Sequence, residues 1–272
     1  MDENSPPVRI NKILARAGLC SRRRADERIL AGEVSLNGEV VRDPGSRARR
    51  GDVLRVGDRE FAFGPLTDSP HLYLLLNKPV RVVSTLRDPQ GRETLRDLLP
   101  RLYADKRLFP VGRLDFFSEG FLLMTNDGEL TRRLTHPGFH VPKYYELLAR
   151  GPVSEEQLER MRGGMTLAEG ERLAPLEVER AEADADCGRG WGERGVFLRL
   201  TLKQGVNRQI RRMCRDLGLT VLRLRRVGQG PLRLGGLRPG ECRELSPEEA
   251  LELKKAAGMK PSLRAFSFPD KV

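Results

Sequence analysis

The stretch from Val111 to Gly128 reads VGRLDFFSEGFLLMTNDG, and it decides the fold. Its second half, Gly120 to Thr125, is an apolar run of strand length that stops at Asn-Asp-Gly, a strong turn signal. Asp115 lies ahead of this run, between Arg113 and two phenylalanines. Because a rigid strand fixes the loop that enters it, Asp115 is the leading candidate for a catalytic carboxylate. The alternative is a structural aspartate that caps a turn or pairs with Arg113, since aspartate is common in loops.

The charge of the chain predicts a polyanionic partner. Lysine and arginine number 49 against 38 acids, a formal net charge of +11. Residues 199–243 hold 12 basic and 2 acidic residues (12 − 2 = +10), whereas residues 143–198 hold 8 and 12 (8 − 12 = −4). The excess is concentrated in one stretch, so nucleic acid is favoured over a merely solvated basic surface.

Composition also indicates the compartment. Hydrophobic residues make up 39% of the 272, enough for a sizeable core. The cysteines (Cys20, Cys187, Cys214, Cys242) lack the paired spacing of a zinc site or disulfide framework. No apolar run approaches the ~20 residues of a membrane span, and the acidic start MDENSPPVRI is unlike a signal peptide. We expect a cytoplasmic protein without membrane contact.

Residues 9–62 have the pattern of a small independent module. Apolar residues at helical spacing predict a first helix, and Ser21 provides an N-cap for a second. Asn37-Gly38 marks the turn of a hairpin. The expected elements are helices over 10–17 and 22–31, a hairpin over 34–41 and a final strand over 53–56.

Residues 63–70 (FGPLTDSP) have the composition of a linker, and a second domain over 71–245 follows. Its first apolar run, 72–76, suggests a strand covered on both faces and ended by Asn77-Lys78-Pro79. Further strands are expected over 82–85, 120–125, 145–149, 196–202 and 221–227, with helices over 129–134, 154–162 and 208–217. Residues 181–194 are expected to form a surface loop. Residues 246–272 should form a capped helix, to 257, and a tail. The fold class is α+β, with a large, mixed, mostly antiparallel sheet flanked by helices.

Three arginines cluster near the start of one expected helix. Arg208, Arg211 and Arg212 have the i, i+3, i+4 spacing of one helical face. They could hold phosphate, or one could pair with a buried carboxylate. The alternative is a solvated basic face, but Gln209 and Ile210 fit a helix that is partly buried.

A second cluster is Lys143-Tyr144-Tyr145. In a strand, Lys143 and Tyr145 point to one side and Tyr144 to the other. A tyrosine here could stack on a nucleobase, worth ~1–3 kcal/mol, although on spacing alone a core tyrosine fits equally well.

Motifs for metals and nucleotides are missing from the sequence. The three histidines, His71, His136 and His140, have no metal spacing, and no P-loop, GxGxxG or GxSxG is present. We expect no metal and no cofactor, so a carboxylate, a tyrosine and arginines would have to carry any reaction.

Two family resemblances add to this interpretation. Residues 9–62, above all Cys20 to Asp26 (CSRRRAD), resemble the RNA-binding module first seen in ribosomal protein S-four. The alternative is an ordinary basic helical hairpin. The basic side chains that would meet RNA are Lys12, Arg16, Arg22, Arg23 and Arg24.

Over about residues 9–250 the chain resembles bacterial rRNA pseudouridine synthases of the RsuA/RluB/RluE/RluF group. The resemblance rests on GRLD at 112–115 with Ser118 and Gly120, on TNDG at 125–128, on Lys143-x-Tyr145 and on NRQIRR at 207–212. QGVNRQIRRMC (204–214) is most similar to the RluF branch, and RluB-like sequences more often carry Glu-Gly-Arg at 204–206. Phe121 stands where the signature usually has Leu. Both departures leave the target nucleotide open.

The resemblance implies roles for the site residues. Asp115 would be the nucleophile, Tyr145 would lie against the target base, and Arg211 would form a salt bridge with Asp115. Arg113 would fill the gap left by a flipped base. The side chains expected to contact RNA in this domain are Arg113, Lys143, Arg208 and Arg212.

The expected function is isomerisation of uridine to pseudouridine in ribosomal RNA, with large-subunit rRNA favoured, by a monomer. Small-subunit rRNA and tRNA are alternative substrates. A non-catalytic RNA-binding assembly factor is the alternative from another class, although pure binding has no use for Asp115. A methyltransferase is disfavoured by the lack of a cofactor loop. The target uridine and the order of bond cleavage stay open.

Overall fold

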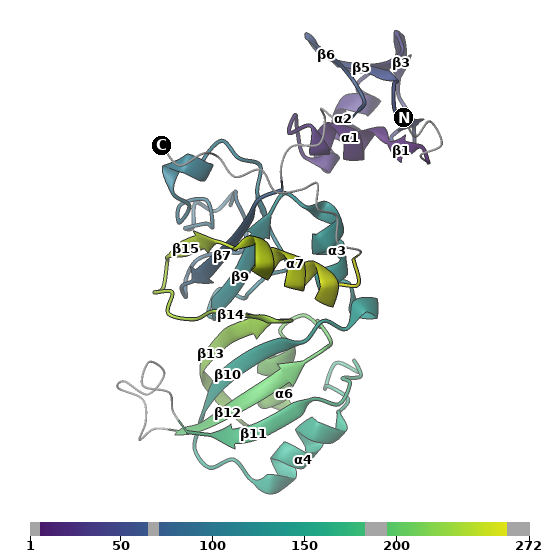
Figure 1. Cartoon of the computed structure of the whole chain (residues 1–272). Helices are drawn as coiled ribbons and strands as arrows, with labels where there is room; N and C mark the ends of the chain where they lie inside the picture. The colour runs from purple at the N-terminus through teal and green to yellow at the C-terminus, as the bar shows by residue number, and fades with distance from the viewer. Residues whose placement is uncertain (1–5, 65–70, 183–194, 260–272) are drawn as a thin grey trace. The chain divides into compact units, whose positions relative to one another are not determined.

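The structure is a computed structural model that describes residues 6–64, 71–182 and 195–259. It divides between His71 and Leu72 into two compact units (Figure 1), named below the N-terminal and the C-terminal unit. Each unit has a hydrophobic core of its own. Helices and sheets occur in both units, and the α+β fold class is confirmed.

The N-terminal unit combines two short helices with a small antiparallel sheet in the order β3-β2-β5-β6. Ser21 is the N-cap of the second helix, and its Oγ accepts a hydrogen bond from Arg24 N (3.1 Å). Asn37 and Gly38 join β2 to β3 with positive φ (51° and 88°), as a type I′ turn requires. The helices and the hairpin are therefore confirmed. The elements are β1 (Val8–Arg9), α1 (Ile10–Arg16), α2 (Arg22–Leu30), β2 (Val34–Leu36), β3 (Glu39–Val41), β4 (Arg47–Ala48), β5 (Val53–Val56) and β6 (Arg59–Ala62).

Two expectations about this unit are corrected. The strand over 53–56 is not the last, because β6 pairs with it. Phe63, assigned from the sequence to the linker, is 3% exposed and packs in the core with Leu54 and Ile29. Its large apolar ring is buried in this core, although a glycine and a proline follow it in the chain. The rest of the expected linker, 65–70, lies outside the described residues.

The C-terminal unit is built on one large sheet in the order β11-β12-β10-β13-β9-β7-β15, with β14 beside β13 and β8 beside β9. The pairings along it are antiparallel except for β13 with β9, which confirms the mixed, mostly antiparallel sheet. The strands are β7 (Tyr73–Lys78), β8 (Phe109–Pro110), β9 (Glu119–Thr125), β10 (Lys143–Arg150), β11 (Glu177–Ala181), β12 (Gly195–Leu202), β13 (Thr220–Gln229), β14 (Leu232–Arg233) and β15 (Cys242–Glu244).

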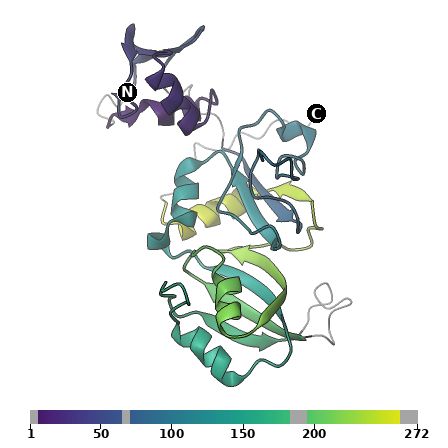
Figure 2. The same ribbon diagram turned by 180° about the vertical axis from the view of Figure 1, so that it is seen from behind.

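Helices cover the sheet in two groups. The helices α3 (Gly128–Thr135) and α7 (Pro247–Ala256) pack on the part formed by β7 and β9 (Figure 1). The helices α4 (Glu155–Gly163) and α6 (Gln209–Asp216) pack on the part formed by β10 to β13 (Figure 2). The capping box expected for α7 is present, with Ser246 as N-cap.

The central strands β7 and β9 are buried along their whole length, as expected from their continuous apolar runs. Side chains alternate between two cores: Leu75 and Leu123 face the core with α3 and α7, whereas Leu74 and Leu122 face the core with Leu114. Strand β9 is therefore packed on both faces of the sheet, and it fixes the end of the loop that precedes it.

Two local expectations are wrong. Strand β7 does not end at residue 76 but continues through Asn77 and Lys78, which are both buried. Residues 82–85 are not a strand, and only an isolated bridge joins Val83 to Thr94. Strand β9 does end at Asn-Asp-Gly (126–128) as expected, and α3 begins there. There Asp127 accepts hydrogen bonds from two backbone N–H groups of the first turn (3.1 and 3.0 Å).

Gly120 explains the one parallel pairing. Its φ is +102°, and a Cβ placed there would lie 2.2 Å from the carbonyl oxygen of Arg226 on β13. Only glycine allows this conformation and this approach at once. Of the loop expected over 181–194, residues 183–194 lie outside the described residues, and β11 ends at Ala181.

Candidate active site

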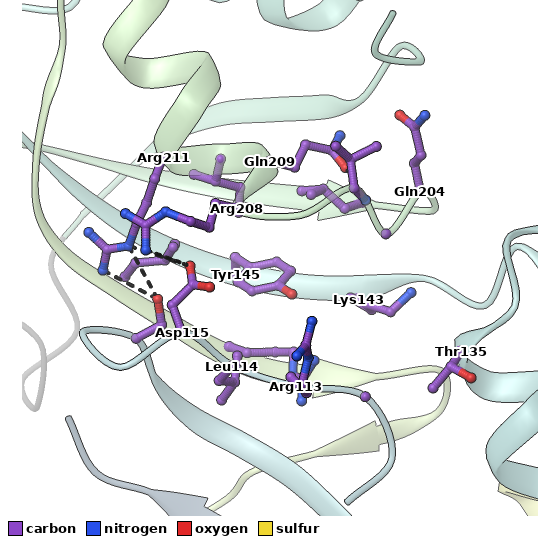
Figure 3. A pocket seen from close by; sticks show the side chains of 18 of the residues that line it. Arg113, Leu114, Asp115, Thr135, Lys143, Tyr145, Gln204, Arg208, Gln209 and Arg211 are labelled. Carbon is purple, nitrogen blue, oxygen red and sulfur yellow. Dashed lines mark hydrogen bonds and ion pairs between the residues drawn. The ribbon is translucent and has the colours of Figure 1, made fainter. Parts of the chain in front are cut away.

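A pocket of about 160 Å³ opens beside Asp115 in the C-terminal unit (Figure 3). Its walls come from the loop before β9, from β10, from β13 and from the segment that joins β12 to α6. Its charged lining residues are Arg113, Asp115, Lys143, Arg208, Arg211 and Arg226. One carboxylate thus stands among five basic side chains, so the described lining favours an anionic ligand.

Two arginines form ion pairs with Asp115. Arg211 Nε lies 3.8 Å and Arg208 Nη1 lies 3.9 Å from the same oxygen, Asp115 Oδ2 (Figure 3). The ion pair with Arg211 that the family resemblance implies is therefore present, and Arg208 adds a second. Both distances exceed that of a hydrogen bond. The arginines therefore attract the carboxylate electrostatically but do not hydrogen-bond to its oxygens.

Arg208 and Arg211 reach Asp115 in different ways. Arg208 is the N-cap of α6 and adopts a left-handed backbone conformation (φ 50°), which places it outside the helix proper. Arg211, in the first turn, also donates hydrogen bonds to Phe117 O (2.6 Å) and Ser118 Oγ (3.2 Å). Burial lowers the pKa of Arg211 and the charge of Asp115 opposes that shift, but a guanidinium stays protonated.

The loop that carries Asp115 is fixed along its backbone. Ser84 Oγ donates to Leu114 O (2.7 Å) and accepts from Leu114 N (3.1 Å). Arg81 N donates to Phe116 O (2.6 Å), and Ser118 N donates to Asp115 O (3.0 Å). Bonds on both sides of Asp115 hold its backbone in one conformation, as a preorganised site requires.

Lys78 lies beneath this loop and is a site residue that the sequence analysis missed. Its side chain is fully buried, and Nζ donates to the carbonyl oxygens of Pro79 (2.9 Å), Asp115 (3.3 Å) and Ser118 (2.9 Å). An ammonium has three donors, and all three are used. Burial lowers the pKa of Lys78 to about 8, against the attraction of Asp115 and Glu119. Lys78 was missed because Asn-Lys-Pro was taken for the end of the strand.

Strand β10 contributes Lys143 and Tyr145 to the pocket and turns Tyr144 away, as the alternation predicts. Tyr144 instead lies under Arg233, whose Cζ is 3.9 Å from the ring centroid. Tyr145 is half-buried and stands opposite Arg226 across the β10–β13 pairing. Burial, and then the charge of Arg226, lower the pKa of Lys143 to about 8.

Arg226 is the other pocket residue that the sequence analysis missed. It is 2% exposed, and its Nε donates to Phe121 O (2.7 Å). Alternation along β13 could have revealed it, because Arg226 shares a face with buried Leu224. A basic residue on an apolar face indicates a buried charge. In the sequence, however, Arg226 stands among other arginines, so the alternation was overlooked.

Arg212 does not join the pocket, so the expectation that it shares a face with Arg208 and Arg211 is wrong. Its guanidinium pairs with Glu171 (2.6 Å) and Glu169 (3.0 Å) instead. Arg113 does line the pocket and is exposed. The remaining expected RNA contacts belong to the N-terminal unit. Of these, Arg16, Arg22, Arg23 and Arg24 are exposed and Lys12 is partly buried.

Much of the basic stretch 199–243 is compensated by acids. Besides Arg212, several of its arginines form ion pairs with carboxylates from other segments or from their own helix. The pairs are Arg215 with Glu169 and Asp216, Arg223 with Glu119, Arg225 with Glu146 and Arg243 with Glu249. Much of the positive charge expected over this stretch is therefore offset locally, and Arg208, Arg211 and Arg226 are the arginines of the stretch that line the pocket.

Within the described ranges no group of three or more His, Cys, Asp or Glu side chains could hold a metal ion. No helix in the same ranges is long and apolar enough to cross a membrane.

A carboxylate held by arginines beside a tyrosine, in a chain with a small basic helical unit, defines an enzyme that acts on RNA. Comparison with known families agrees: residues 72–216 match the family described as RNA pseudouridylate synthase, and residues 8–54 match the S4 domain. The chain belongs to the RNA pseudouridylate synthase family, whose members are isomerases.

Individual relatives are similar over nearly the whole chain. An uncharacterized RNA pseudouridine synthase of Aquifex aeolicus is 38% identical over 93% of this chain and 96% of its own length. Ribosomal large subunit pseudouridine synthase B of Bacillus subtilis is 34% identical over 92% and 96%. A crystal structure of a pseudouridylate synthase has a TM-score of 0.62 and 27% identity, covering 90% of this chain and 99% of the other.

Proposed function

We propose that this protein converts uridine to pseudouridine in ribosomal RNA of the large subunit, with Asp115 as the reacting carboxylate. The observation that carries the proposal is the position of Asp115 in the pocket, 3.8 and 3.9 Å from two guanidinium groups that leave its oxygens accessible. A surface built only to bind RNA would gain nothing from a negative charge there.

The reaction is an isomerisation, and its atoms balance within one nucleotide. The bond from uracil N1 to C1′ breaks, a bond from C5 to C1′ forms, and the proton lost from C5 is matched by one gained at N1. No oxidant, reductant or transferred group is needed, so we propose that no cofactor takes part.

The pocket residues divide the work as follows. The target base leaves its stack to enter the pocket, at a cost of a few kcal/mol. Asp115 attacks the sugar or the base, or removes a proton from the sugar, while the ion pairs with Arg211 and Arg208 hold it in position. Tyr145 packs against the uracil and is placed to assist removal of the C5 proton. Arg113, exposed at the rim, fills the gap left in the RNA.

The large-subunit assignment is supported by relatives named ribosomal large subunit pseudouridine synthase B in Bacillus subtilis and Pseudomonas aeruginosa, 34% and 36% identical. A monomer suffices, because residues of one chain line the whole described pocket. Small-subunit rRNA and tRNA are the alternative substrates for the same chemistry.

Pseudouridine mapping tests the substrate. Total rRNA and tRNA from cells with and without the gene are labelled with carbodiimide and mapped by primer extension. We expect one or a few modifications to disappear from large-subunit rRNA and to return on complementation. Loss confined to small-subunit rRNA or tRNA would identify that RNA as the substrate instead. If every modification persists, the alternative of a non-catalytic assembly factor is favoured.

A further inference from the structure

Phe117 is an exposed aromatic residue two positions after Asp115. Its side chain is 57% exposed, although the C-terminal unit has large apolar cores. Single exposed hydrophobic residues are common and need no explanation by themselves. The surroundings of Phe117 decide whether this one has a use.

The backbone around Phe117 is fixed, so its exposure does not come from a loose loop. Phe117 O accepts a hydrogen bond from Arg211 Nη2 (2.6 Å), and Phe116 O accepts one from Arg81 N (2.6 Å). The two phenylalanine rings meet edge to face, with centroids 5.1 Å apart. The backbone that carries the exposed ring is therefore fixed in part by the same arginine that pairs with Asp115.

The exposed basic residues of this loop and of its bonded neighbours suit RNA. Arg113 lies four residues before Phe117, Arg81 is bonded to the preceding carbonyl, and Arg208 pairs with Asp115; all three are exposed. An aromatic face among arginines is the usual way in which proteins hold unstacked RNA bases, since the arginines bind phosphate and the ring stacks on a base.

Phe117 does not line the pocket that Asp115 and Tyr145 line. A base stacked on Phe117 is therefore outside the pocket and is not the base that reacts. We propose that Phe117 stacks on a nucleobase adjacent to the target uridine in the RNA, and that it thereby contributes to the choice of site. This inference rests on the proposed function, because it places the target nucleotide in the pocket.

The test compares Phe117→Ala with Leu102→Ala in the full-length protein. Leu102 is a matched control, because it is 69% exposed in the same unit and lies on the short helix Arg101–Tyr103. Binding to transcribed large-subunit rRNA fragments is measured by filter retention, and turnover by release of tritium from C5 of uridine. We expect Phe117→Ala to weaken binding and raise KM about 5- to 140-fold with little change in kcat. That is the loss of one stack, ~1–3 kcal/mol at 1.4 kcal/mol per tenfold. Phe117→Trp should retain wild-type affinity.

Short synthetic RNAs that carry one abasic position each then identify the stacked base. When the abasic position is that base, we expect wild-type protein to bind the abasic RNA as weakly as Phe117→Ala binds intact RNA. Phe117→Ala should bind the abasic RNA no more weakly than that. Phe117→Ala with the affinity of Leu102→Ala would overturn the inference, as would additive effects at every position, which would place the contact elsewhere. If wild type binds but releases no tritium, the proposed function fails, while the binding data still decide the stack.

Discussion

Asp115 lies near two arginines that compensate its charge without covering its oxygens, which is the balance a reacting carboxylate needs. Arg211 contributes most to this arrangement, since it also bonds to Phe117 O and Ser118 Oγ in the same loop. One side chain thus both pairs with the acid and bonds to the loop that carries it.

Replacing Arg211 tests that double role. We expect Arg211→Met to lower kcat roughly 100-fold or more, in the range found when one preorganised electrostatic partner is removed. Arg212→Met is the matched control, because Arg212 is the next residue in α6 but pairs with Glu169 and Glu171 away from the pocket. Steady-state tritium release measures both. Equal losses in the two variants would indicate a general effect on α6.

Lys143 should make RNA binding depend on pH. Burial lowers its pKa to about 8, so it is charged at pH 7 and largely neutral at pH 9. Because the charged form attracts phosphate, affinity should fall as pH rises through about 8. Lys143→Arg, which stays charged, should show a smaller fall. Lys78 titrates in the same range, so only the difference between wild type and Lys143→Arg is informative. Parallel pH profiles would contradict the assignment.

The sequence predicted the side chains whose neighbours in the chain define a pattern. Asp115, Tyr145 and Arg211 stand in recognisable motifs, and all three line the pocket. Lys78 and Arg226 were missed because their roles arise from burial across the sheet. Arg212 was misplaced for a related reason: helical spacing does not reveal acids more than 40 positions away in the chain.

At the scale of elements, β9 ties the Asp115 loop to the sheet, and Gly120 makes this possible. An added Cβ would meet Arg226 O at 2.2 Å. We expect Gly120→Ala to destabilise the protein by about 3 kcal/mol or more, from overpacking and backbone strain together. Gly128→Ala is the control, since nothing lies within 4 Å of its added Cβ. Thermal unfolding compares them, and a wild-type Tm for Gly120→Ala would show that the junction adapts.

Long apolar runs predicted the central strands and amphipathic spacing predicted the helices, because both patterns follow from burial. The short strands β11 and β15 were missed because they carry mixed, partly polar sequences, such as EVERA at 177–181. Their pairing partners, not their own composition, make them strands. Asn-Asp-Gly at 126–128 was correctly expected to end the strand ahead of a helix, because Asp127 suits an N-cap position.

At the scale of the whole molecule, the two units supply separate positive regions. In the N-terminal unit, Arg22 and Arg23 are exposed on α2. We expect Arg22→Glu with Arg23→Glu to weaken RNA binding and to reduce the slope of log K against log salt by about 2, one per phosphate contact. Arg59→Glu, exposed on β6, should change neither as much. An unchanged salt slope in the double variant would exclude these contacts.

The central claim is that Asp115 is the reacting group, and Asp115→Asn tests it most directly. The variant keeps the size of the side chain and removes its charge, so Arg208 and Arg211 lose their partner while the loop keeps its backbone bonds. Pseudouridine formation in the mapped rRNA fragment should fall by about 10⁴-fold or more. Affinity for the same RNA should be equal or tighter, because a negative charge has gone. Activity near that of wild type, in a variant that folds and binds normally, would contradict the account.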